Sequence, residues 1–118
     1  LLERGIIPDD SISVLLVLGR YTENQQSNAA DIAPLLCHLP KVQHWSLCAF
    51  GSSEEDCMLE AIQQGGHCRV GFENNLLMSD GTLAADNAAL VKAVGDGALL
   101  LDRTVASAND ARRMLGLR

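Results

Sequence analysis

Basic side chains are scarce in this sequence. Its 118 residues contain nine lysines and arginines against fifteen aspartates and glutamates, which gives a formal net charge of −6 at pH 7. Surfaces that bind nucleic acid or anionic membranes need clustered positive charge, so we expect neither kind of partner. A long apolar run is also lacking, because the longest one, residues 14–18, is much shorter than the roughly 20 residues that cross a bilayer.

The four cysteines show no Cys-x-x-Cys spacing, so a zinc or redox motif of that kind is absent from the sequence. The chain is 47% hydrophobic and 20% charged, an ordinary globular composition that can build a core without disulfides. No stretch combines a basic region with a long apolar core, as a secretory signal peptide does. We therefore expect reduced, mostly buried thiols in a cytoplasmic protein.

No internal repeat, low-complexity stretch or linker divides the chain, and its length is typical of one domain. The opening residues, "LLERG", resemble the last turn of a helix, with Gly5 just beyond its end. The first residue is not methionine. We therefore expect this chain to be the tail of a longer protein.

Strand-like and helix-like segments alternate along the chain. Strands are predicted over residues 11–18, 45–50 and 68–73, and helices over residues 30–39, 53–64, 86–100 and 107–116. The first strand is a continuous β-branched and aliphatic run, which is typical of a strand buried on both faces. Capping boxes are expected at Ser52 with Glu55 and at Ser107 with Asp110. In the predicted helix over residues 53–64, Cys57, Met58, Ala61 and Ile62 share one face. This order predicts an α/β fold with parallel strands and right-handed crossovers.

The segment "GGHCRVGFENN" places charged side chains in the third predicted strand. Side chains alternate along a strand, so Arg69 and Glu73 would share one polar face with His67. Burial of these charges without partners would be strongly unfavourable. In a barrel the polar face would point into the lumen, and Glu73 would lie at the carboxyl end, where the active sites of such barrels are found.

A structural ion pair is the alternative for these two charges. At about 3.3 Å per residue, the Cα atoms of Arg69 and Glu73 would be roughly 13 Å apart in an extended strand. Both side chains would then have to stretch toward each other to meet.

A carboxylate at a strand end could also bind a metal, provided that other ligands lie close by. His67 would be roughly 20 Å from Glu73 along the strand. His44 begins the preceding strand and His38 lies near a helix end, so we expect all three histidines to be structural or solvated. Any further ligands of a metal at Glu73 are therefore expected outside this chain.

Several blocks of the sequence, in order, resemble one enzyme family. They are "VLGRYTENQQSNAADIAPLL", "WSLCAFG", "GGHCRVGFENN", "DGTLAADNAALV" and "VASANDARRMLGL". Together they are similar to the C-terminal part of the β-keto acid cleavage enzymes, a family that includes the 3-keto-5-aminohexanoate cleavage enzyme. The resemblance covers nearly the whole chain.

The resemblance implies a (β/α)8 barrel with a divalent metal, usually zinc. It implies the condensation of a β-keto acid with acetyl-CoA to give acetoacetate and a new acyl-CoA. Glu73 matches the family's metal-binding glutamate on the last strand, whose two histidine partners lie on an early strand. Arg69 matches an arginine in the network that helps to deprotonate the substrate. Asn74 occupies a catalytic position where some members carry aspartate, and asparagine cannot act as a base.

A typical barrel needs about 250 residues, so residues 1–118 are expected to form a C-terminal fragment with about three β/α units of a TIM barrel. Such a slice exposes strand edges, and we expect it to be inactive and to self-associate or unfold when alone. At full length, the resemblance implies a cytoplasmic homo-oligomer that acts on small molecules.

Two alternatives remain open. Another metal-dependent barrel lyase or aldolase could use Glu73 as a ligand. The chain could instead be a non-catalytic α/β module or a remnant, in which Arg69 and Glu73 form only a structural ion pair. No motif identifies the particular β-keto acid.

Overall fold

The computed structural model describes residues 4–7, 12–39, 42 and 44–117. In this part of the chain three strands form one sheet in the order β1-β2-β3. The strands are β1 (Ser13–Leu18), β2 (His44–Ala49) and β3 (His67–Cys68). β1 pairs with β2 and β2 with β3, both in parallel, so the predicted parallel α/β arrangement is confirmed. Residues 1–3 of the predicted helix end "LLERG" and residue 11, the first of the first predicted strand, lie outside the described residues.

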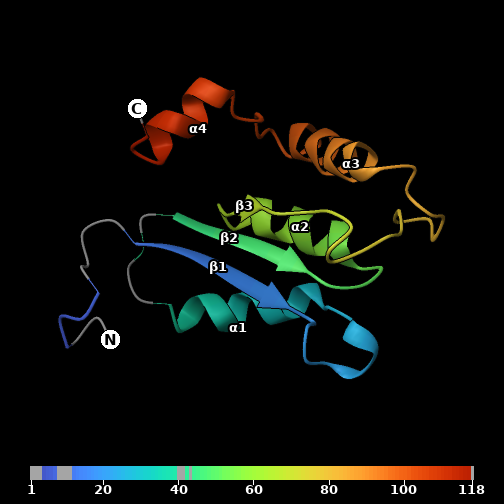
Figure 1. The fold of residues 1–118 in the computed structure, drawn as a ribbon, viewed down its shortest axis with the longest axis horizontal. Helices are drawn as coiled ribbons and strands as arrows, with labels where there is room; N and C mark the ends of the chain where they lie inside the picture. The colour runs from blue at the N-terminus through green and yellow to red at the C-terminus, as the bar shows by residue number, and fades with distance from the viewer. Residues whose placement is uncertain (1–3, 8–11, 40–41, 43, 118) are drawn as a thin grey trace.

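Helices connect the strands and follow the last one. They are α1 (Ile32–Cys37), α2 (Glu54–Gln63), α3 (Asn87–Leu100) and α4 (Ala108–Met114), with short 3-10 turns η1 (Glu23–Gln25) and η2 (Ala29–Asp31). α2 packs against β2 and β3 and also contacts α1 and α3. In Figure 1, α1 and α3 lie on opposite sides of the sheet. Within the described residues, none of the helices is long and apolar enough to cross a membrane.

The helix starts agree only in part with the predicted capping boxes. The Ser107 box is confirmed, because Asp110 N donates to Ser107 Oγ at 3.2 Å and Ser107 N donates to Asp110 Oδ2 at 3.0 Å. The box at Ser52 is wrong, since α2 begins one residue later, after Ser53, which makes no side-chain cap bond. The first turn of α2 instead contains acidic side chains, which interact favourably with the positive end of the helix dipole.

The core lies between the sheet and α2. One face of α2 is buried through Cys57, Met58, Ala61 and Ile62, as its spacing predicted. All four cysteines are free thiols, in agreement with the expected reduced state; Cys37 is exposed and the others are buried or half-buried. Burial raises the pKa of the Cys57 thiol to about 11, so this thiol is neutral at physiological pH.

The other face of the sheet is exposed at β1, whereas Cys48 of β2 is buried on that face within the described residues. Leu15 and Val17 of β1 are 42% and 44% exposed, whereas Leu47 in β2 is fully buried on the α2 side. The prediction that the first strand is buried on both faces is therefore wrong for this part of the chain. Among the described residues, β3 also has no strand partner on the edge opposite β2.

Candidate functional site

The third strand is shorter than predicted, and this changes the geometry of the site. β3 ends at Cys68, and Arg69 N makes one further bond to Leu47 O at 2.8 Å. The chain then turns at Gly71, whose φ is +145°. This backbone angle favours glycine, and a Cβ atom at this position would also lie 2.9 Å from Asn87 Oδ1, so the Asn87 side chain would have to move. The extended strand predicted over residues 68–73 is therefore wrong beyond its first residues.

Residues 71–75 form what we call the site turn. Asn74 N and Asn75 N both donate to Gly71 O, at 2.9 and 3.1 Å. Gly51 N, after β2, donates to Asn74 O at 3.2 Å and ties the turn to the neighbouring loop. Glu73 consequently lies in a turn at the carboxyl end of the sheet and not within a strand.

The site turn brings Glu73 back to Arg69. Arg69 Nη2 donates to Glu73 Oε2 in an ion pair, so the separation predicted from an extended strand is wrong. The two side chains are 41% and 67% exposed, and the carboxylate raises the pKa of the guanidinium. Exposed ion pairs stabilise folds only weakly, so this pair holds two charges in place more than it holds the fold together.

Asn74 is the second unusual group of the turn. The residue is only 8% exposed, and its Nδ2 is buried with no hydrogen-bond partner among the described residues. Buried amide groups are almost always hydrogen-bonded, so an unsatisfied one indicates an acceptor supplied by a ligand or by another segment. Arg69, Glu73 and Asn74 line one hollow of about 310 Å³ together with Asn87. The structure thus brings together the three residues that the sequence singled out.

Glu54 was missed by the sequence reasoning. This first residue of α2 is 2% exposed, and it accepts hydrogen bonds from Gly71 N at 3.4 Å and from Asn75 Nδ2 at 3.2 Å. Burial raises the pKa of Glu54, while these bonds act in the opposite direction. A signal was present in the sequence: Glu54 precedes Cys57 and Met58 by three and four residues, which continues the buried stripe of α2 by one turn.

Two neighbours complete the surroundings of the turn. Asn87, at the start of α3, accepts a hydrogen bond from Phe72 N at 2.8 Å. Cys48 Sγ lies 4.0 Å from Arg69 Nη1, and burial raises the pKa of this thiol, which therefore stays neutral. A groove of about 420 Å³ adjoins the turn and is also lined by residues 24–26 and 50–52 from the loops after β1 and β2.

The histidines lie away from the turn. His44 and His67, at the amino ends of their strands, have ring centroids 5.6 Å apart, and His44 Nε2 donates to Met114 O at 2.7 Å. His38 Nδ1 donates to Pro34 O at 2.7 Å, which agrees with the predicted structural role. No group of three or more histidine, cysteine, aspartate or glutamate side chains is placed to hold a metal ion within the described residues.

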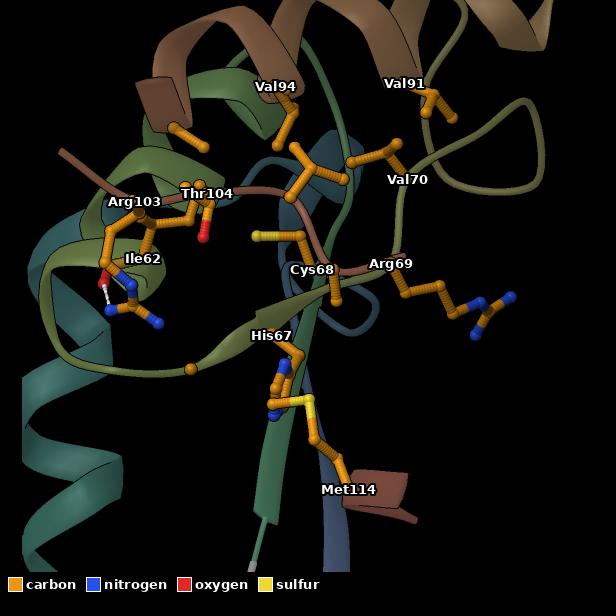
Figure 2. Close-up of a pocket in the computed structure, with 15 residues that line it drawn as sticks. Ile62, His67, Cys68, Arg69, Val70, Val91, Val94, Arg103, Thr104 and Met114 are labelled. Carbon is orange, nitrogen blue, oxygen red and sulfur yellow. Dashed lines mark hydrogen bonds between the residues drawn. The ribbon is translucent and has the colours of Figure 1, made fainter. Parts of the chain in front are cut away.

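A separate cavity of about 480 Å³ lies between β3, α3 and residues 103–106 (Figure 2). Its walls include Val70 and Val94, and Arg103 Nη1 donates across it to Ile62 O at 2.7 Å. Figure 2 shows the Arg69 side chain directed away from Arg103. Arg69 and Val70 line both this cavity and the polar hollow, so the two adjoin each other just after β3.

Comparison with known proteins gives consistent matches. The sequence matches the family model described as beta-keto acid cleavage enzyme over residues 1–117. It is 34% identical over 92 residues to a 3-keto-5-aminohexanoate cleavage enzyme of Fusobacterium nucleatum, covering 78% of this chain and 34% of that protein. It is 34% identical over 87 residues to the protein of the same name from Acetoanaerobium sticklandii, covering 74% of this chain and 32% of that one.

A third relative carries a different name. A 3-oxoadipate:acetyl-CoA acetyltransferase of Cupriavidus necator is 37% identical over 73 residues, covering 62% of this chain and 26% of that protein. The chain thus spans about a third or less of the length of these curated relatives. Because the family model covers residues 1–117 of this 118-residue chain, the chain belongs to the β-keto acid cleavage enzyme family.

Proposed function

We propose that the protein containing this chain condenses a β-keto acid with acetyl-CoA and releases acetoacetate and a new acyl-CoA. The observation that carries the proposal is the family match over residues 1–117, combined with the placement of Arg69, Glu73 and Asn74 around one hollow at the carboxyl end of a parallel sheet. The relatives' names include two β-keto acids, 3-keto-5-aminohexanoate and 3-oxoadipate, and acetyl-CoA.

In this proposal the complete protein is a (β/α)8 barrel, and the chain forms about three of its β/α units. The parallel order β1-β2-β3, with a helix after each strand, supports this arrangement. The exposed face at Leu15 and Val17 would line the lumen, and the free edge of β3 would pair with a strand from elsewhere in the protein. Self-association of complete copies into a homo-oligomer stays a prediction.

Glu73 is the proposed ligand of a divalent metal, with zinc as the first metal to test. The residue fits this role because Oε2 is held by Arg69 while the second carboxylate oxygen is left for a metal, and the side chain is 67% exposed. A hydrogen-bonded neighbour of this kind orients a metal ligand. The remaining ligands would come from outside this chain. When bound, the metal polarises the keto oxygen of the substrate and stabilises developing negative charge.

The side chains of this chain have separable roles in the proposed reaction. Arg69 holds the Glu73 carboxylate, and its remaining N–H groups can donate to a substrate carboxylate or to a developing oxyanion. Asn74 Nδ2 can donate to a substrate oxygen. An amide does not accept a proton at neutral pH, so the base must be a different group from Asn74.

The test is an assay of the complete protein. Acetoacetate is measured with acetyl-CoA and a panel of β-keto acids that includes 3-keto-5-aminohexanoate and 3-oxoadipate, before and after chelation and with zinc added back. We expect activity with at least one acid, loss on chelation and recovery with zinc. Absence of acetoacetate with every acid would overturn the reaction. Full activity in demonstrably metal-free protein would overturn only the proposed requirement for a metal.

One observation favours the alternative in which the two charges are structural. Arg69 and Glu73 do contact each other, as a simple ion pair would. Glu73→Gln separates the readings by zinc titration of the complete protein. Unchanged zinc binding together with unchanged folding supports a structural pair, whereas lost zinc binding supports the metal site.

A further inference from the structure

Glu54 is a charged residue in an apolar setting. It begins α2, is 2% exposed, and lies on the same helix face as the buried Cys57 and Met58. A carboxylate in such a place is tolerated only when it is hydrogen-bonded. Its position at the N-terminus of α2 also favours negative charge, but exposed Asp56 in the same turn of the helix shares that advantage without being buried. The helix dipole therefore does not explain why Glu54 points inward.

Both carboxylate oxygens of Glu54 face the site turn. Oε1 accepts from Gly71 N at 3.4 Å, and Oε2 accepts from Asn75 Nδ2 at 3.2 Å. Gly71 and Asn75 are the first and last residues of the turn, so the two bonds bracket the residues that carry the site. Glu54 thus holds the turn at both ends while its own bonds leave the side chains of Glu73 and Asn74 free for other partners.

Asn75 links this contact to the next part of the chain. Its Nδ2 also donates to Leu77 O at 2.6 Å, and its Oδ1 accepts from Leu77 N at 2.9 Å. The Asn75 amide is therefore fixed in one orientation, in which Nδ2 donates both to Glu54 Oε2 and to Leu77 O. On the opposite side, Asn87 of α3 holds Phe72 N at 2.8 Å. Hydrogen bonds from both α2 and α3 thus hold the turn, and Glu54 makes the ones from α2.

We propose that Glu54 is a positioning residue, which places the Glu73 carboxylate and the Asn74 amide by fixing both ends of the site turn. This inference rests on the proposed function for its catalytic consequence. The geometry demands a carboxylate in particular. Both partners are N–H donors, so a glutamine would offer one acceptor oxygen and would turn an NH₂ group toward the other donor. Glu54→Gln therefore removes one bond while keeping the size of the side chain.

The test compares Glu54→Gln with Asp56→Asn in the complete protein. Both variants remove one negative charge from the first turn of α2, but Asp56 is exposed and makes none of these contacts. For Glu54→Gln we expect a loss of about 10-fold in both kcat and zinc affinity, the usual size for groups that orient metal ligands. KM for acetyl-CoA should stay within about twofold, because the group acts on the placement of Glu73 and Asn74. Glu54→Asp, which keeps two acceptor oxygens, should recover part of the loss.

Hydrogen exchange gives a readout that does not depend on activity. Peptides covering residues 71–75 should exchange faster in Glu54→Gln than in Asp56→Asn. If exchange, zinc affinity and kcat of the two variants agree within about twofold, below the 10–100-fold range for such groups, the positioning role is wrong. If the parent protein makes no acetoacetate, the proposed function fails, while the exchange data still decide the role of Glu54.

A variant on the turn side guards against misfolding of Glu54→Gln. Asn75→Ala removes the same hydrogen bond from the other partner. Should Glu54→Gln fail to fold, a matching loss of kcat in folded Asn75→Ala supports the proposal, and unchanged kcat overturns it.

Discussion

The two ends of the sheet differ in how completely their polar groups are satisfied. At the amino end, His44 donates to Met114 O, and burial and the neighbouring His44 lower the pKa of His67, which favours the neutral form of that one ring. At the carboxyl end lie an exposed ion pair, a buried amide with no partner among the described residues, and a buried carboxylate. Unsatisfied bonding capacity is therefore concentrated at one end of the described sheet. The difference shows where a substrate or metal has something to bind.

The largest expected effect comes from removing the exposed carboxylate of the carboxyl end. Glu73→Gln in the complete protein should abolish zinc binding and lower kcat by about 1,000-fold, because a metal supplies several kcal/mol of charge stabilisation and each tenfold in rate is about 1.4 kcal/mol. Zinc titration and acetoacetate formation measure the two effects. His67→Gln, at the amino end, is the control and should leave both unchanged. An equal loss of zinc binding and kcat in the two variants would show that the two ends of the sheet do not differ in function.

A smaller effect is expected from the buried amide. Asn74→Leu keeps a similar volume and removes a buried donor that has no partner among the described residues. The melting temperature should therefore stay equal or rise, while kcat falls on the order of 100-fold, as for removal of one hydrogen-bond donor to a developing charge. Thermal unfolding and steady-state kinetics on the same preparation measure the melting temperature and kcat. A variant that is less stable and fully active would show that the amide serves the fold.

The smallest effect concerns the pH dependence contributed by Glu54. Burial raises its folded-state pKa above the ordinary value of 4.5. Protonation of Glu54 is then easier in the folded state than in the unfolded chain, so the contribution of Glu54 to stability is fully present below pH 4.5 and is lost as pH rises through the raised pKa.

Melting temperatures from pH 4 to 7 measure this contribution as wild type minus Glu54→Gln. This difference should become more negative as pH rises, by less than about 5 °C. The corresponding difference for Asp56→Asn should not change with pH. A shift in the opposite direction would mean that the bonds from Gly71 and Asn75 outweigh the burial.

Much of the architecture follows from local sequence patterns. The parallel order of the strands, the buried stripe of α2 and the Ser107 box were all predicted, because each depends on side-chain periodicity or on residues within one turn of a helix. The position of Glu73 at the carboxyl end of the sheet was also predicted, although the strand before it is shorter than expected. Roles for Arg69, Glu73 and Asn74 came from resemblance, and they stay predictions.

The geometry of the site could not be predicted, because long-range contacts decide it. The pattern of "CRVGFE" suits a strand, whereas the observed turn includes a hydrogen bond from Phe72 N to Asn87 Oδ1, fifteen residues away in the sequence. The inward position of Glu54 depends on donors from Gly71 and Asn75, seventeen and twenty-one residues away in the sequence. The predicted capping box at Ser52 would have started the helix at Ser53, whereas α2 begins at Glu54.

The anchoring of the site turn has an evolutionary consequence. Asn74 is held through its main chain, by Asn74 N to Gly71 O and by Gly51 N to Asn74 O, while its Nδ2 has no hydrogen-bond partner among the described residues. The scaffold residues Gly71, Glu54 and Asn87 keep the backbone in place whatever stands at position 74. A single-base exchange between aspartate and asparagine codons can therefore alter the chemistry offered to the substrate while the backbone path is inherited unchanged.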